Sequence, residues 1–146
     1  MLPSRQHDFG GRGAASLKQA GIGGLAHLVN FAGTDTLTVL LYAWAFYDEP
    51  MAGYSIPAAE HSTMTEWGKA GETETLRNML HRFGGPGKFV AVVSDSYEIY
   101  HAVAETWGER LKEEVRQMGG TLVVRPDSGD PTVVSPICWE RTSATR

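Results

Sequence analysis

The chain has 146 residues, of which 42% are hydrophobic and 21% charged, and its formal net charge is −4. This length fits one domain, and this composition is typical of a globular protein, which excludes a disordered tail or a coiled coil. Thirteen basic residues against 17 acidic ones argue against a nucleic-acid-binding protein, because neutralising phosphates requires a basic surface. The single cysteine, Cys138, excludes an internal disulfide. The sequence shows no secretory signal and no apolar run of the roughly 20 residues that cross a bilayer, so we expect a cytoplasmic protein without membrane partners.

Apolar spacing predicts strands and helices in alternation. In chain order these are a strand at His27–Phe31, a helix at Thr36–Tyr47, a strand at Tyr54–Pro57, a helix at Glu72–Phe83, a strand at Phe89–Val93, a helix at Tyr97–Met118 and a strand at Leu122–Val124. The helix at 36–47 is apolar on nearly every side, so we expect it to be buried on most faces. The last two strands are continuously apolar, as strands covered on both faces tend to be. The alternating order predicts an α/β fold with parallel strands.

Polar residues follow each predicted strand. The four clusters begin at Gly33, Ala58, Ser94 and Arg125. Active sites of parallel α/β folds lie at the carboxyl ends of the strands, so these clusters indicate a functional site. Helix capping is the alternative for the hydroxyl and carboxylate residues, but it does not explain an arginine or a histidine.

At these clusters the sequence resembles the nicotinamide phosphoribosyltransferase family. Six segments carry the resemblance in that family's order and spacing: HDFGGRG (7–13), AGIGG (20–24), HLVNFAGTDT (27–36), GYSIPAAEHSTM (53–64), VVSDSYEIY (92–100) and VVRPDSGDP (123–131). The resemblance implies an internal part of an irregular α/β barrel, so we expect residues 1–131 to form a partial (β/α) barrel of the type II phosphoribosyltransferase kind. HDFGGRG is then expected to follow a strand that this chain lacks.

Residues 132–146 depart from the family pattern. They contain Pro136 and no helical period, so we expect an irregular tail outside the family domain. A frameshift or truncated gene model and a divergent C-terminal arm are the two explanations that the sequence leaves open.

The resemblance also implies the reaction. The family transfers 5-phosphoribosyl from phosphoribosyl diphosphate to nicotinamide, giving nicotinamide mononucleotide and diphosphate in NAD biosynthesis. It implies Mg²⁺ bound with phosphoribosyl diphosphate, ATP as a coupled phosphoryl donor, and a homodimer. Nicotinate as the substrate is one alternative, and a catalytically inactive fragment or interaction module is another. For the isolated chain we expect no activity, because it resembles only part of the barrel.

Three residues in the first half take binding roles from the resemblance. Phe9 is expected to stack on the pyridine ring, Arg12 to bind phosphate through its guanidinium, and Asp35 to accept a hydrogen bond from the nicotinamide amide. Because a carboxylate repels nicotinate, Asp35 favours the amide substrate. Their alternatives are a core phenylalanine, a solvated surface arginine and a helix N-cap.

Three residues further along the chain take catalytic roles. His61 matches the histidine that accepts a phosphoryl group from ATP. Arg125 is expected to contact the carboxamide and a phosphate, and Asp127 the ribose hydroxyls, with an ion pair between these two as the alternative. We expect the catalytic and binding residues to converge at one mouth of the barrel, without a metal site of the protein's own. Three further residues are expected to line the pocket: Ser55, Ser94 and Asp95.

Overall fold

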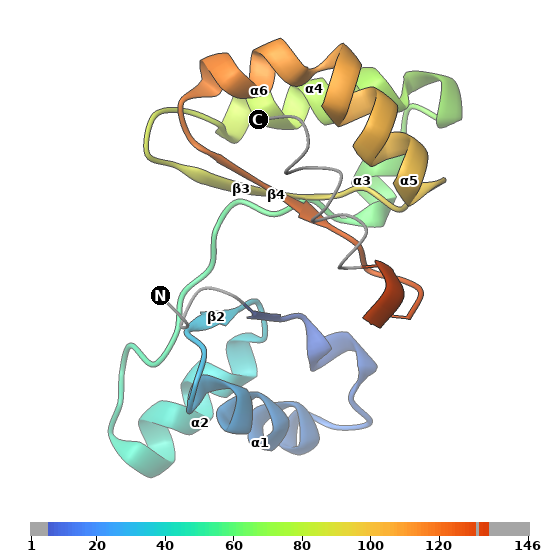
Figure 1. Cartoon of the computed structure of the whole chain (residues 1–146). Helices are drawn as coiled ribbons and strands as arrows, with labels where there is room; N and C mark the ends of the chain where they lie inside the picture. The colour runs from blue at the N-terminus through green and yellow to red at the C-terminus, as the bar shows by residue number, and fades with distance from the viewer. Residues whose placement is uncertain (1–5, 131, 135–146) are drawn as a thin grey trace. The chain divides into compact units, whose positions relative to one another are not determined.

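The computed structural model describes residues 6–130 and 132–134. The chain divides into two compact units, Met1–Ile56 and Pro57–Arg146, and each is described by itself. Figure 1 shows the helices and strands of both units. The described residues contain two pairs of parallel strands with helices, which confirms the α/β class, whereas no barrel is formed by these residues.

The first unit contains one parallel strand pair and two long helices. Its elements are β1 (His7–Asp8), the 3₁₀ turn η1 (Gly10–Gly13), α1 (Leu17–Leu28), β2 (Gly33–Thr34) and α2 (Leu37–Tyr47). β1 pairs with β2, and Tyr54 adds one parallel bridge to Gly33. HDFGGRG therefore contains its own strand, and the prediction that this strand is missing is wrong.

The strand predicted at 27–31 is also wrong, because helix α1 continues to Leu28 and residues 29–31 form no strand. Ser16 caps the helix by accepting a hydrogen bond from the Gln19 amide at 3.1 Å. Its glycines have low helix propensity, which concealed the helix in the sequence. Two of them are needed for packing against α2, since a Cβ atom at Gly24 would lie 1.9 Å from Val39 and one at Gly21 would lie 2.8 Å from Tyr42.

Helix α2 has the predicted extent but not the predicted burial. Only Val39 and Ala43 are buried, whereas Leu37, Trp44 and Phe46 are 61–76% exposed. Side chains of α1 and α2 also line an apolar hollow of about 810 Å³. A contiguous exposed apolar surface of this kind is typical of an interaction site. The expected burial of α2 on most faces is therefore wrong for this chain.

The second unit contains the other parallel strand pair. Its elements are α3 (His61–Thr65), the 3₁₀ turn η2 (Lys69–Gly71), α4 (Glu72–Phe83), β3 (Phe89–Val93), α5 (Ile99–His101), the π-helix η3 (Ala102–Arg110), α6 (Lys112–Met118) and β4 (Thr121–Arg125). β3 and β4 pair in parallel with Phe89 opposite Thr121. The predictions for 72–83, 89–93 and 122–124 are confirmed. The helix predicted at 97–118 is confirmed in extent, but it consists of three pieces.

The core of the second unit lies between the strands and helices. Leu76 of α4, Val92 of β3 and Leu111 are at most 1% exposed and belong to one apolar cluster. β3 is covered on both faces as predicted, whereas β4 is only partly buried, so that prediction is wrong for β4. The strand predicted at 54–57 is also wrong, because this stretch and its neighbour Ala58 form only single bridges.

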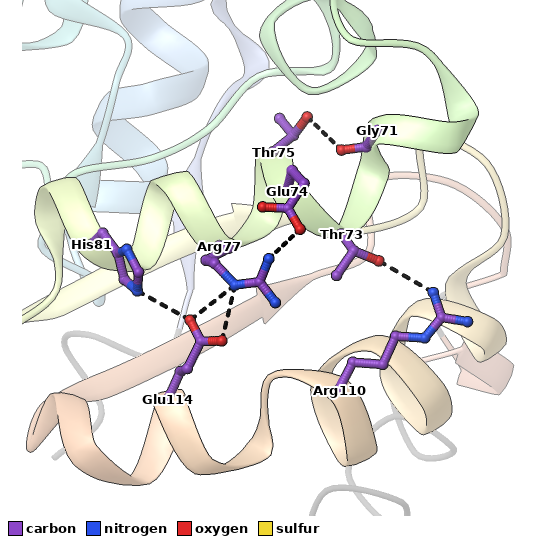
Figure 2. A network of polar contacts seen from close by, with 8 residues as sticks. All are labelled: Gly71, Thr73, Glu74, Thr75, Arg77, His81, Arg110 and Glu114. Carbon is purple, nitrogen blue, oxygen red and sulfur yellow. Dashed lines mark hydrogen bonds and ion pairs between the residues drawn. The ribbon is translucent and has the colours of Figure 1, made fainter.

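A polar network joins α4 to α6 (Figure 2). Arg77 of α4 donates from Nε to both carboxylate oxygens of Glu114, at 2.9 and 3.1 Å, and its Nη1 contacts Glu74. His81 Nε2 lies 3.0 Å from Glu114 Oε2. Glu114 therefore links α6 to two consecutive turns of α4.

The predicted tail overlaps the described residues only at 132–134. These residues form a helical turn, and buried Val134 packs against Val103. The rest of the tail lies outside the described residues, so the boundary at 131/132 stays a prediction. Within the described part of the chain, no helix has the length and hydropathy that a bilayer span requires.

Candidate functional site

The glycine turn of the first unit is anchored by Asp8, at the end of β1. Asp8 Oδ1 accepts a hydrogen bond from the Gly10 amide at 2.8 Å, and Oδ2 accepts one from the Thr34 hydroxyl at 3.1 Å. Burial raises the pKa of Asp8, but hydrogen bonds from Gly10, Thr36 and Thr34 outweigh it and hold the pKa below its ordinary value. Asp8 therefore connects the turn to the end of β2.

Asp35 follows β2 and lies in a polar group of its own. Its amide donates to the Asp8 carbonyl at 2.9 Å, and its carboxylate accepts a hydrogen bond from the Ser55 hydroxyl. His7 Nε2 lies 3.4 Å from Asp35 Oδ1, and the His7 ring lies 4.6 Å from the ring of Phe9. The N-cap of α2 is Thr36, so the alternative role of Asp35 as that N-cap is wrong.

Arg12 lies on the exposed side of the glycine turn. Together with Asp35 it lines a hollow of about 400 Å³, whose wall also includes Leu17 and Thr36. The first unit thus presents a guanidinium, a carboxylate and a hydroxyl near the end of β2. Phe9 is half-buried at the start of the turn.

In the second unit, three extended segments run in parallel and end at one edge. The Ala59 amide donates to the Ala91 carbonyl at 2.9 Å, and the Ala91 amide donates to the Pro57 carbonyl at 2.8 Å, so residues 57–59 lie beside β3. β4 lies on the other side of β3. His61, Asp95 and Asp127 follow these segments, and the parallel arrangement therefore brings them together.

The side chain of His61 lies among three polar groups. Its Nδ1 is 2.9 Å from the hydroxyl of Ser96, and its Nε2 is 3.3 Å from Asp127 Oδ2 and 3.7 Å from Asp95 Oδ1. His61 is the first residue of α3, whose N-cap is Glu60. The imidazole is about one-third exposed, so a ligand can reach it.

Asp95 is the buried member of this group, with a side chain 3% exposed. Its Oδ2 accepts hydrogen bonds from the Asp127 amide at 2.8 Å and from the Ser128 hydroxyl at 2.6 Å. Its Oδ1 is buried without a hydrogen bond and faces His61. Asp95 thus ties the loop after β3 to the loop after β4.

Ser94 lies in the interior of the second unit. Its hydroxyl donates to the Val92 carbonyl and accepts from the Trp107 indole, both at 3.0 Å. Its predicted contact with substrate stays a prediction. Arg125 is the last residue of β4, and its carbonyl accepts a hydrogen bond from the Ser94 amide at 3.1 Å.

The structure groups the predicted site residues unit by unit. The first unit contains Phe9, Arg12, Asp35 and Ser55, and the second contains His61, Ser94, Asp95, Arg125 and Asp127. Their convergence at one mouth of a barrel stays a prediction. Ser96 is one of the hydroxyl residues for which helix capping is the alternative, and the structure places it against His61 instead. The sequence signal for this contact is its position three residues after β3, beside Asp95.

A model of the nicotinate phosphoribosyltransferase family matches residues 4–144. The chain belongs to this family. It is 60% identical over 138 residues to the nicotinamide phosphoribosyltransferase of Xanthomonas campestris pv. campestris, a match that covers 94% of the chain and 30% of that relative. It is 34% identical over 141 residues to the protein of that name from Acinetobacter baylyi, covering 92% of the chain and 27% of the relative.

A third relative of that name, from Mycoplasma pneumoniae, is 38% identical over 124 residues, covering 85% of the chain and 25% of the relative. This family member therefore spans less than one third of the length of the curated relatives it matches. The family match continues past residue 131 to residue 144, into the stretch that the sequence predicted to lie outside the domain.

Proposed function

We propose that the chain supplies binding and catalytic residues of a nicotinamide phosphoribosyltransferase. This enzyme transfers 5-phosphoribosyl from phosphoribosyl diphosphate to the pyridine nitrogen of nicotinamide and releases diphosphate. The observation that carries the proposal is the 60% identity to a relative of that name over 94% of the chain. Because transfer leaves positive charge on the ribose and negative charge on the diphosphate, catalysis requires positioned charges more than covalent chemistry.

The first unit would bind the pyridine end and a phosphate. The carboxylate of Asp35 would accept a hydrogen bond from the amide NH₂ of nicotinamide, with Ser55 orienting it. Phe9 would stack on the pyridine ring, and His7 supports the face of Phe9 that it contacts. Arg12 would bind phosphate through two parallel hydrogen bonds.

The second unit would couple ATP to the transfer. We propose that His61 accepts a phosphoryl group from ATP, that Asp127 binds the ribose hydroxyls and that Arg125 contacts the carboxamide and a phosphate. The imidazole is partly exposed and lies beside the carboxylates of Asp95 and Asp127. Both features support a site where the imidazole accepts a phosphoryl group and exchanges a proton.

Mg²⁺ would enter with phosphoribosyl diphosphate. Mg²⁺ prefers oxygen ligands and is commonly held by one or two carboxylates together with substrate phosphates. The phosphates of the substrate would supply most of these oxygens. Among the described residues no group of three or more His, Cys, Asp or Glu side chains could hold a metal ion.

Nicotinate is the second candidate substrate, because the matching family model bears its name. The carboxylate of Asp35 disfavours it, since two carboxylates at hydrogen-bonding distance repel each other.

The exposed apolar side chains of α2 support a further proposal, that the chain is incomplete by itself and that the active enzyme is a homodimer containing the rest of the family domain.

The test uses a full-length chimera in which this chain replaces the aligned segment of the Xanthomonas campestris relative. With phosphoribosyl diphosphate and Mg²⁺ we expect the chimera to form nicotinamide mononucleotide and to prefer nicotinamide to nicotinate. A preference for nicotinate would contradict the role of Asp35. The 146-residue chain by itself should give no product, and a monodisperse, cooperatively melting chain that turns over nicotinamide would refute its proposed incompleteness.

A further inference from the structure

The two nitrogens of the His61 ring have opposite surroundings. Nε2 faces the carboxylates of Asp127 and Asp95, at 3.3 and 3.7 Å, whereas Nδ1 lies 2.9 Å from the hydroxyl of Ser96. A carboxylate can only accept a hydrogen bond, but a hydroxyl can donate or accept. The carboxylates therefore favour the neutral tautomer with its proton on Nε2, and the hydroxyl permits the proton on either nitrogen.

Ser96 is held in place by its neighbours in the chain. The Ser94 amide is bonded to the Arg125 carbonyl, and the buried Asp95 carboxylate is bonded to the Asp127 amide and the Ser128 hydroxyl. These bonds fix residues 94 and 95, directly before Ser96, to the end of β4 and to the loop that follows it. The Ser96 hydroxyl consequently reaches the imidazole from a defined backbone position, which is what an orienting hydrogen bond requires.

We infer that Ser96 is a positioning residue that makes Nε2 of His61 available for phosphoryl transfer. The inference rests on the proposed role of His61 as phosphoryl acceptor. With the proton on Nδ1 donated to Ser96 Oγ, Nε2 has a free lone pair. That lone pair forms an N–P bond with the γ-phosphorus of ATP. At the same time the bond between the γ-phosphorus and the bridging oxygen breaks, and the electrons of that bond leave with ADP. Without the hydroxyl, the Nε2–H tautomer bonded to Asp127 predominates, and its Nε2 has no lone pair to react.

A matched pair of variants of the chimera separates the hydrogen bond from the volume of the side chain. Ser96→Thr keeps a hydroxyl, whereas Ser96→Val introduces a side chain of almost the same shape as threonine but without the hydroxyl. We expect ATP hydrolysis to fall about tenfold in S96V, the effect of losing one hydrogen bond of typical strength, and to be largely retained in S96T. The control Ser62→Ala changes a neighbouring serine whose hydroxyl contacts Glu60 instead of the imidazole, and it should hydrolyse ATP normally.

The readout is ADP release, together with nicotinamide mononucleotide formed with and without ATP. A general structural defect lowers all three rates in S96V and S96T alike, whereas loss of the tautomer lowers ADP release and the stimulation by ATP in S96V more than the ATP-independent rate. Equal ADP release by S96V and S96T would overturn the inference about Ser96. His61→Ala tests the proposed function separately: if ATP still stimulates H61A, the phosphoryl role of His61 is wrong, whatever S96V does.

Discussion

Adjacent glycines of α1 should respond in opposite ways to the same substitution. A Cβ atom at Gly24 would lie 1.9 Å from Val39 Cγ2 and 3.0 Å from Asp8 Oδ2, whereas one at Gly23 would meet nothing within 4 Å. Alanine in a helix is more favourable than glycine by roughly 1 kcal/mol, but inserting a methyl group into a packed contact costs about 1–3 kcal/mol. Because the overlap with Val39 is severe, the upper end applies at Gly24.

Gly24→Ala should therefore destabilise the first unit by about 2 kcal/mol, and Gly23→Ala should stabilise it by up to about 1 kcal/mol. The assay is urea denaturation of the 146-residue chain followed by hydrogen exchange in peptides from α1 and α2, which reports on the first unit alone. The displaced Asp8 carboxylate should also loosen the bond to the Gly10 amide, so exchange at the glycine turn should rise in G24A. Equal shifts in the two variants would refute the close approach of α1 and α2.

Three other changes test the site and its support. Asp35→Ala in the chimera should weaken nicotinamide binding by about 1.5–3 kcal/mol, the usual loss for a hydrogen bond to a charged acceptor, and unchanged affinity by calorimetry would exclude that contact. Asp8 has a pKa below its ordinary value of 3.8, so its ionised form stabilises the fold above that pH and loses this effect as the pH falls further. Asp8→Asn should therefore be less stable than the parent at pH 7, and the difference between the two melting temperatures should narrow below about pH 3.8. Glu114→Ala should lower stability by about 1 kcal/mol, reduced by added salt, whereas Glu113→Ala, which breaks only an exposed 3.7 Å contact with Arg116, should have almost no effect in the same melts.

The sequence was most informative where local patterns agree with tertiary packing. Glu72–Phe83 has one apolar side that enters the core, and the structure places both helix ends where the pattern predicted them. Phe89–Val93 is apolar throughout because both of its faces are covered. In helix α1 the local pattern and the packing disagree, because the glycines that allow its contact with α2 also lower its helix propensity. The sequence therefore did not predict this helix.

The site could be predicted from strand ends even where a strand was misplaced. Asp35 follows β2 at Gly33–Thr34 instead of a strand at 27–31, yet it lies at a carboxyl end as expected. The contacts of His61 with Asp95 and Asp127 follow from three parallel segments. The order of elements predicted β3 and β4, but it placed the third segment at 54–57, whereas residues 57–59 lie beside β3. The partner of Nδ1 could not be predicted, since it depends on which of two serines beside Asp95 turns outward. Ser94 is bonded to Trp107 and Ser96 to the imidazole.

The π-helix η3 has a consequence for sequence length between β3 and β4. Its last turn closes from the Leu111 amide to the Thr106 carbonyl at 2.8 Å, five residues apart, so it holds one residue more than an α-helical turn. Removing a residue such as the exposed Glu105 would restore α-helical spacing and rotate everything that follows by about 100°. Val115 and Met118 would then turn away from the core cluster. We therefore expect homologous sequences that are one residue shorter in η3 to have the apolar residues of α6 shifted by one position along the helix. The extra residue of the π-helix thus determines which side chains of α6 face the core.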